Sequence, residues 1–319
     1  MRRALLAALV ALLAASPAAA QTWPQKPVKL VVPFAPGGSN DIMARLVGQK
    51  LSERLGQQFI VDNRPGASGI IGTDAAAKSE PDGYTVLMMS LTLAVNPSLY
   101  AKLPYDTEKD LVPVSLVASA PLMLVVHPSL PAPSVKEFIA YARAQPDKLN
   151  FGSGGAGTTP HLAGELLKSM AGLKVTHVPY KGGGPALADL VGGQIQFMLE
   201  NIPSTLPFVK GGKLRALAVT ALKRSPLVSD LPTLDESGLK GFEIVGWNGF
   251  FVPAGTPPAI ASKLHAEVVK VLALPEVKDR LAGLGADPVG SSPDEFAAFL
   301  RAEMRKWAKL VKDAGIKVE

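Results

Sequence analysis

Two glycine-rich segments, each between an apolar run and a helical pattern, restrict the fold of this chain more than any other feature. Residues 28–32 form a continuous apolar run, typical of a strand buried on both faces of a parallel sheet, and a Gly/Pro-rich turn follows at 33–40. The same order recurs where residues 148–151 lead into the glycine-rich segment 152–159. Strands that alternate with helices predict α/β architecture, so the repeated unit predicts two α/β lobes.

Helical patterns follow both glycine-rich segments. Apolar side chains recur every four residues from Met43 to Leu55, with Ser39 or Asn40 as the expected N-cap and Gly56 as the stop. A proline at the first helical position opens the second helix. Further strands are predicted at residues 59–62, 84–89, 174–178, 195–199 and 214–220, and further helices at residues 185–191, 259–272 and 293–314.

Two extended stretches lie between the lobes, at residues 114–126 and 242–252, and both are rich in apolar and β-branched residues. Two chain crossings separated by about 120 residues would form a hinge. The sequence therefore predicts one domain at residues 22–123 plus 246–319 and a second domain at 124–245, joined by a two-strand hinge.

The first twenty residues have the pattern of a secretory signal peptide. Arg2 and Arg3 form a basic start, residues 4–15 are apolar, and Ala18 to Ala20 provide small residues for cleavage near Ala20. The alternative, a membrane anchor, is disfavoured because the apolar run is shorter than the ~20 residues that span a bilayer. We therefore expect an exported protein that resides in the periplasm.

Composition excludes several classes of protein. The chain has no cysteine, which rules out a disulfide framework, thiol catalysis and Cys-ligated metal sites. Removal of the two signal-peptide arginines lowers the formal net charge from +6 to +4. The basic residues are spread along the chain, without the clustered stripe that nucleic-acid binding needs, so no nucleic-acid partner is expected.

Enzyme motifs are incomplete in the glycine-rich segments. Residues 152–157 match the dinucleotide fingerprint, but the next predicted strand leads into residues 178–181 without an acid for a ribose hydroxyl. The hydrolase elbow G-x-S-x-G is broken around Ser39 and Ser153, and Thr158 stands where a phosphate-binding loop needs lysine. We expect no enzyme, with a hydrolase or dehydrogenase as the alternative.

The four histidines of the chain are scattered along its length. His161 and Glu165 have the i, i+4 spacing of one helix face, but no third ligand accompanies them. The sequence therefore predicts no metal site, and a histidine at a helix start is more often a hydrogen-bonding or packing residue than a metal ligand.

The two glycine-rich segments indicate an anion-binding cleft. Each places a helix N-terminus after a strand, where free N–H groups and the positive end of the helix dipole attract anions. Ser39, Ser153, Thr158 and Thr159 add hydroxyls beside the glycines. The alternative is that these glycines only permit tight turns between strands and helices.

A series of short motifs runs along the mature chain in a fixed order and spacing. They are Trp23-Pro24-x-Lys26-Pro27, residues 32–41, 61–67, 81–85, 96–100 and 152–165, His177-Val178-Pro179-Tyr180-Lys181-Gly182, residues 217–220 and residues 253–257. Together they resemble the motifs of the tripartite tricarboxylate transporter receptors, also called Bug proteins. The resemblance implies a type II periplasmic-binding-protein fold, closure of the cleft on the ligand, and no cofactor. It also implies a small carboxylate as ligand.

The resemblance also implies a set of ligand-binding residues, because members of the family hold a ligand carboxylate between the two loops. The residues that match are Phe34, Ala35, Gly37, Gly38, Ser39 and Asp41 in the first loop, Ser90 and Thr92 after a first-lobe strand, and Ser153, Gly154, Gly157, Thr158, Thr159, His161, Tyr180 and Lys181 in the second lobe.

One position departs from the family pattern. Relatives commonly show Phe-Asp-Asn before Pro-Ser, whereas this chain has Leu199-Glu200-Asn201. If Glu200 points into the cleft, its longer side chain reaches further than aspartate, so we include Glu200 among the candidate ligand-binding residues. The preference of relatives for the distal part of a ligand does not transfer to this chain.

Three questions remain open at the level of sequence. The ligand is a mono- or dicarboxylate, an amino acid or an aromatic acid; a sugar is disfavoured because Trp23, Trp247 and Trp307 lie outside the predicted cleft loops. The partner is a membrane permease or, alternatively, a sensor kinase of a two-component system. We expect a monomer.

Overall fold

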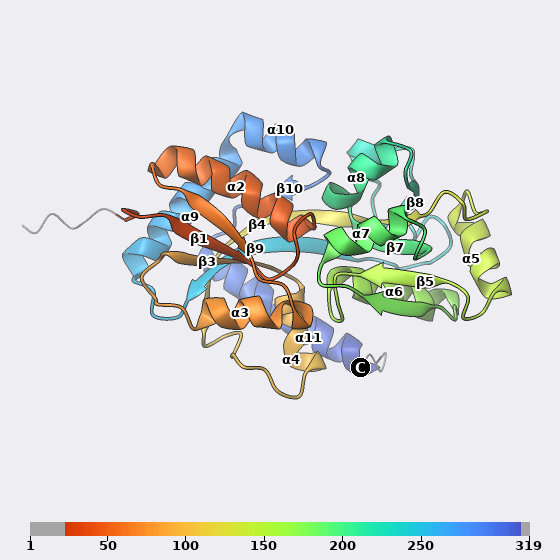
Figure 1. Cartoon of the computed structure of the whole chain (residues 1–319), viewed down its shortest axis with the longest axis horizontal. Coiled ribbons are helices and arrows are strands. Elements are labelled where there is room, and N and C mark those ends of the chain that lie inside the picture. The colour runs from red at the N-terminus through yellow and green to blue at the C-terminus, as the bar shows by residue number, and fades with distance from the viewer. Residues whose placement is uncertain (1–22, 314–319) are drawn as a thin grey trace, which may run out of the picture.

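The structure, a computed structural model, describes residues 23–313 and has two α/β lobes along its long axis (Figure 1). The predicted signal peptide lies outside the described residues. The two glycine-rich segments belong to different lobes, so the prediction of two α/β lobes is confirmed.

The first lobe is built on strands β1, β2 and β3, with β1 in the middle and parallel to both neighbours. Its strands are β1 (Val28–Val32), β2 (Phe59–Asn63) and β3 (Thr85–Ser90). Its early helices are α2 (Ser39–Leu55), η1 (Ala67–Gly69), α3 (Ile70–Ala77) and α4 (Thr92–Leu99).

The second lobe repeats this arrangement, with β5 parallel to both β6 and β7. Its strands are β5 (Asn150–Ser153), β6 (Thr176–Pro179), β7 (Phe197–Asn201) and β8 (Arg215–Val219). Its helices are α5 (Val135–Ala144), α6 (Thr159–Ala171), α7 (Gly183–Val191), α8 (Ile202–Lys210) and η2 (Pro226–Val228).

A long strand, β4 (Leu111–Val126), takes part in both lobes. Residues 111–121 pair antiparallel with β9 (Val245–Pro253), and residues 122–126 pair antiparallel with β7. β9 also pairs with β3 of the first lobe. In Figure 1 both strands run along the long axis of the molecule between the lobes, as expected for the two extended stretches.

The C-terminal part of the chain returns to the first lobe. It comprises α9 (Pro258–Ala273), α10 (Pro275–Gly283), the short strand β10 (Asp287–Pro288) and α11 (Pro293–Asp313). β10 pairs with β4, and α11 lies against α4 and β4. Trp247 of β9 packs edge-on against Phe296 and Phe299 of α11, which fixes the last helix beside the inter-lobe strands.

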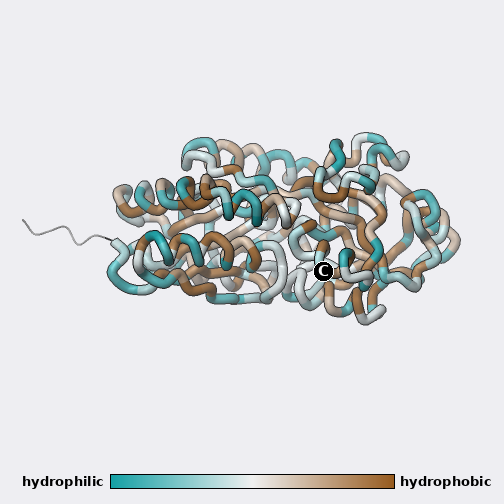
Figure 2. The backbone as a smooth tube through the Cα atoms, turned by 90° about the horizontal axis from the view of Figure 1, so that it is seen from above, coloured by the Kyte–Doolittle hydropathy of each residue, from teal (hydrophilic) through white to brown (hydrophobic). Residues whose placement is uncertain are grey.

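The sequence pattern explains the α2 helix, except at its start. Met43, Val47 and Leu51 are buried, as their spacing predicts, and Gly56 ends the helix in a left-handed conformation that glycine adopts without strain. The expected cap at Ser39 or Asn40 is wrong, because Gly38 is the N-cap and both polar side chains bond to Asn248 instead. In Figure 2 the helices alternate between hydrophobic and hydrophilic colours, as expected when one face is buried.

Candidate functional site

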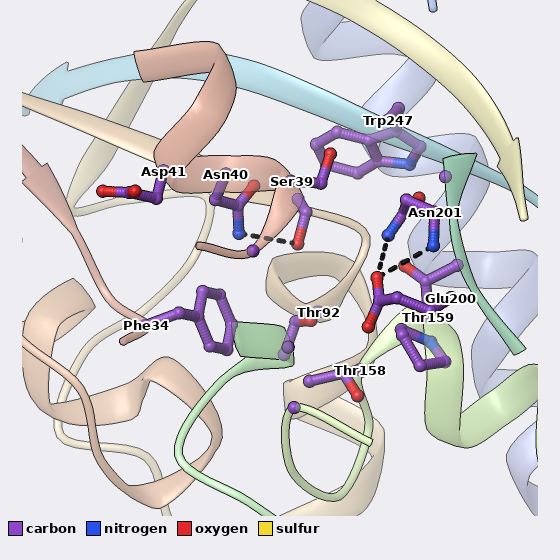
Figure 3. Close-up of a pocket in the computed structure, with 16 residues that line it drawn as sticks. Phe34, Ser39, Asn40, Asp41, Thr92, Thr158, Thr159, Glu200, Asn201 and Trp247 are labelled. Atoms are coloured by element: carbon purple, nitrogen blue, oxygen red, sulfur yellow. Dashed lines mark hydrogen bonds between the residues drawn. The ribbon is translucent and has the colours of Figure 1, made fainter. Parts of the chain in front are cut away.

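A cavity of about 50 Å³ lies between the two lobes (Figure 3). Residues of both lobes line it: Phe34, Gly38, Ser39, Asn40, Asp41, Ser90, Thr92, Gly154, Thr158, Thr159, Pro160, Gly183, Glu200, Asn201, Gly246 and Trp247. None of these lining residues is Lys, Arg or His. Any attraction for an anion therefore has to come from backbone and neutral polar groups.

Five helices begin at this cavity. Their first turns contribute Ser39 of α2, Thr92 of α4, Thr159 of α6, Gly183 of α7 and Asn201, the N-cap of α8. None of the five has a side-chain hydrogen bond at its N-cap. Because the first backbone N–H groups of a helix lack partners within the helix, the cavity collects hydrogen-bond donors and positive dipole ends.

The first-lobe wall is organised by Asp41. Its carboxylate accepts hydrogen bonds from the Gly37 backbone N–H (3.0 Å), from Arg45 Nε (3.1 Å) and from Asn63 Nδ2 (3.0 Å). Burial by itself would raise the pKa of Asp41, but these hydrogen bonds and the charge of Arg45 hold that pKa below its ordinary value. Asp41 is therefore an ionised carboxylate that holds the loop and the helix start in place.

A second set of polar contacts ties the start of α2 to the sheet. Ser39 Oγ donates to Asn248 Oδ1 (3.2 Å), the Asn248 amide donates to Asn40 Oδ1, and Asn40 Nδ2 donates to Ser90 Oγ (3.4 Å). Figure 3 shows Ser39 and Asn40 side by side at the start of the helix. This wall is fixed before any ligand arrives, because its side chains bond to one another.

Glu200 forms part of the second-lobe wall and is only 2% exposed. Its Oε1 accepts hydrogen bonds from Asn201 N (2.8 Å), Asn201 Nδ2 (2.9 Å) and Ser204 Oγ (3.4 Å). Burial raises the pKa of Glu200 above its ordinary value, although these hydrogen bonds act in the opposite direction. Thr92 also faces the cavity, and its buried Oγ1 has no hydrogen-bond partner among residues 23–313.

Ser153 and His161 lie behind the second glycine-rich loop and do not line the cavity. Ser153 Oγ lies 2.6 Å from His177 Nε2 and donates to Gly155 O (3.0 Å). His161 Nδ1 accepts from Gly157 N (3.0 Å), and its ring packs on that of His177. Burial, and then the neighbouring charges of His161 and Lys168, lowers the pKa of His177 to about 3, and burial also lowers the pKa of His161. These neutral side chains support the loop.

The two lobes touch beside the cavity. The Ala35 N–H donates to Lys181 O (2.9 Å), and Gly37 lies close to Gly184 at the start of α7. The Tyr180 hydroxyl donates to Asp189 Oδ2 (2.7 Å), and burial, followed by this bond, raises the pKa of Tyr180 to about 12. These residues form inter-lobe and supporting contacts at the rim of the cavity.

The structure brings together ten of the candidate residues predicted from the sequence. Those that line the cavity are Phe34, Gly38, Ser39, Asp41, Ser90, Thr92, Gly154, Thr158, Thr159 and Glu200. Those outside the lining are Ala35, Gly37, Ser153, Gly157, His161, Tyr180 and Lys181.

Sequence reasoning missed six lining residues: Asn40, Pro160, Gly183, Asn201, Gly246 and Trp247. The first four lie next to, or just after, residues of the motifs described above, so sequence proximity to those motifs was the signal for them. Gly246 and Trp247 lie in the middle of a strand-like run and carry no local signal. The three tryptophans lie outside the predicted cleft loops, but β9 brings Trp247 to the cavity wall, which the sequence did not indicate.

Metal-binding clusters and membrane spans are both absent from the part of the chain that the structure describes. Among residues 23–313 no three His, Asp or Glu side chains gather closely enough to bind a metal ion. No helix in the same range has the length and apolar character needed to cross a membrane.

Comparisons with known proteins agree with this fold. Residues 43–316 match a family described as "Tripartite tricarboxylate transporter family receptor". The chain is 40% identical to BugT of Bordetella pertussis over 307 residues, which cover 96% of this chain and 94% of BugT.

Two solved structures resemble it in sequence and fold. Rpa4515 of Rhodopseudomonas palustris, solved with adipate, is 40% identical with a TM-score of 0.91, over 93% of this chain and 100% of that one. MatC of the same organism, with bound malate, is 35% identical with a TM-score of 0.86, over 91% of this chain and 100% of that one.

Proposed function

The chain belongs to the tripartite tricarboxylate transporter receptor family, and we propose that its inter-lobe cavity captures a small carboxylate for uptake across the membrane. Members of this family are periplasmic substrate-binding proteins and not enzymes. The observation that carries the proposal is the convergence of five uncapped helix N-termini on one cavity. Such a site binds a carboxylate through backbone N–H groups without a cationic side chain.

The relatives support a carboxylate ligand, because one was solved with adipate and another with malate. Both molecules carry two carboxyl groups, so dicarboxylates are the first candidates for this chain. The small size of the cavity disfavours a sugar chain or a peptide.

The proposed ligand contacts are residues that line the cavity, except Asp41, whose carboxylate is satisfied within its own lobe. Thr92 and Thr159 offer hydroxyls, whereas those of Ser39 and Thr158 already donate to Asn248 Oδ1 and Gly155 O. The helix starts beside them offer backbone N–H groups. We assign a supporting role to the candidates outside the lining, since Ser153 and His161 hold the second loop. Ala35 joins the first loop to Lys181 of the second lobe.

The proposed mechanism is closure of the two lobes around the ligand. We place the lobes at residues 22–123 plus 246–319 and at 124–245, and the change of β4 pairing partner near Pro121 supports this division. Each lobe supplies only part of the donors, so the closed form binds the anion better than the open form and the ligand shifts the equilibrium towards closure. The closed surface would then be recognised by a membrane permease.

The experiment is a thermal and chemical unfolding screen of the mature protein against adipate, malate, succinate and benzoate, with adipamide as a matched uncharged control. A ligand at about a hundred times its dissociation constant stabilises the folded state by about 2.7 kcal/mol. Stabilisation by an acid but not by the amide supports the proposal. Equal stabilisation by adipamide, or none by any acid, would contradict it.

A further inference from the structure

The two oxygens of the Glu200 side chain have different surroundings. Oε1 accepts hydrogen bonds from Asn201 N and Asn201 Nδ2, and Ser204 Oγ lies 3.4 Å from Oε1 and 3.0 Å from Asn201 O, between which its one proton is shared. Oε2 accepts none from the described residues and lies against Gly183, where an added Cβ would be 2.9 Å away. In Figure 3 the dashed lines from Asn201 reach one oxygen only, and the other points among the residues that line the cavity.

A neutral carboxyl group can satisfy this pattern, although the donors on Oε1 by themselves favour the ionised form and burial opposes them. In a carboxylic acid one oxygen is a carbonyl-type acceptor and the other carries the proton and donates. Oε1 is saturated with donors, so the proton belongs on Oε2, where no donor competes with it. An ionised carboxylate buried in the same place would leave half of its charge without a partner, which is unfavourable in a desolvated site.

No cation compensates a charge on Glu200 among the described residues. The titratable side chains on the elements packed around it contact one another instead: Asp41 with Arg45, Glu165 with Lys168, Asp189 with Tyr180, and His161 with His177. Lys181 and Lys210, which belong to the same lobe, are exposed. The pKa of Glu200 is raised through burial, which agrees with this environment.

We propose that Glu200 is a specificity-determining residue that donates a hydrogen bond from a protonated Oε2 to an oxygen of the bound ligand. The proposal rests on the proposed function, because it assumes a carboxylate in this cavity. The ligand end nearest Glu200 is a carboxylate, carbonyl or hydroxyl oxygen, and an ammonium group is disfavoured there because it cannot accept the hydrogen bond that Oε2 donates.

The first test needs no ligand. Carbon NMR of glutamate side chains labelled at the carboxyl carbon follows each ionisation with pH, and the Glu200 resonance is the one lost in Glu200→Gln. It should remain protonated at pH values where the other glutamates are ionised. Glu165→Gln is the matched control, because Glu165 lies in the same lobe outside the cavity and pairs with Lys168. A Glu200 resonance that titrates with the exposed glutamates would overturn the proposal.

The second test measures the dissociation constant against pH, with the acid that binds most tightly in the unfolding screen. Above the pKa of Glu200 the wild type should lose affinity by up to tenfold per pH unit, because binding requires the proton. Glu200→Gln keeps an N–H donor towards the cavity and cannot ionise, so its affinity should be independent of pH in this range. Glu165→Gln should follow the wild type.

Each remaining outcome has a defined meaning. A wild-type profile that is flat supports the proposal if NMR shows Glu200 protonated throughout, and overturns it if Glu200 is ionised. Loss of binding in Glu200→Gln at every pH, or tighter binding of aspartate than of malate with Glu200 ionised in the complex, overturns it as well. If no acid binds the wild type, the proposed function fails, whereas the NMR titration still decides the state of Glu200.

Discussion

The starts of α2 and α8 both place a buried carboxyl group at the same cavity, yet the two groups differ in state. Asp41 has Arg45 one turn further along its helix and is ionised, with its pKa lowered in spite of burial. Glu200 precedes α8, where the next turn offers the Ser204 hydroxyl in place of a cation, and burial raises its pKa. The residue type therefore does not decide the state of a buried acid; the partner does.

This difference separates a structural role from a binding role. The Asp41 carboxylate accepts its hydrogen bonds from residues of its own lobe. It therefore has no acceptor position left for a ligand. Glu200 keeps one oxygen free towards the cavity. The first-lobe wall is thus fixed before binding, whereas the second-lobe wall still has the Glu200 Oε2 oxygen available for the ligand.

Closure of the two lobes brings the Asp41 wall and the Glu200 wall together around one ligand. We expect Gly184→Ala to prevent this closure. An added Cβ would collide with the Pro36 carbonyl oxygen of the first lobe. We expect a loss of affinity of about 100-fold, equal to about 2.7 kcal/mol, measured by calorimetry with the acid found in the screen. Small-angle scattering should show that the ligand no longer reduces the radius of gyration.

Gly283→Ala is the control for this substitution, since Gly283 ends α10 and an added Cβ would meet nothing within 4 Å. The melting temperature of ligand-free Gly184→Ala measures any direct cost to the second lobe. Wild-type affinity and compaction in Gly184→Ala would show that the contact between Gly184 and Pro36 is not needed for binding.

The next largest effect contrasts the two acids directly. Asp41→Asn should lower the free energy of unfolding by about 1–3 kcal/mol, because it removes the ionic partner of Arg45. It also places an amide N–H group among the donors of Gly37, Arg45 and Asn63, where the carboxylate had accepted. Glu200→Gln should change it by less than about 1 kcal/mol, since its carbonyl can accept the bonds that Oε1 accepts. Urea unfolding at neutral pH measures both. A Glu200→Gln cost as large as that of Asp41→Asn would remove the distinction between the two sites.

The smallest effect is the pH dependence of stability, which should have opposite signs at the two sites. Because the pKa of Glu200 is raised by folding, its contribution is complete below the unfolded-state pKa and is lost as pH rises through the folded-state pKa. Because the pKa of Asp41 is lowered, its contribution is present above the unfolded-state pKa and is lost as pH falls through the folded-state pKa. A folded-state pKa that differs from the unfolded-state pKa by one corresponds to about 1.4 kcal/mol of stability.

Urea unfolding across the acidic and neutral range, in the wild type and in each single variant, resolves these contributions. The stability of Glu200→Gln relative to the wild type should improve as pH rises, and that of Asp41→Asn should improve as pH falls. The same slope in both variants would mean that the two carboxyl groups share one environment.

The local sequence determined the repeated strand, glycine-rich loop and helix units. The four-residue spacing of Met43, Val47 and Leu51 matches a buried helix face, and Gly56 provides a left-handed stop, because both depend only on nearby chain geometry. The same local information placed Ser39 and Thr159 at helix starts that face a cleft. These features could be predicted because periodicity and backbone conformation are properties of short segments.

Tertiary structure decided which of the candidates reach the cavity and in what state. His177, on a neighbouring strand, holds Ser153 behind the loop, whereas β9 carries Trp247 to the cavity wall from far along the chain. The contrast between Asp41 and Glu200 depends on whether a cation packs nearby, which no short segment records. Burial and charge pairing arise between distant elements, so only the folded chain sets the chemistry of the site that the sequence located.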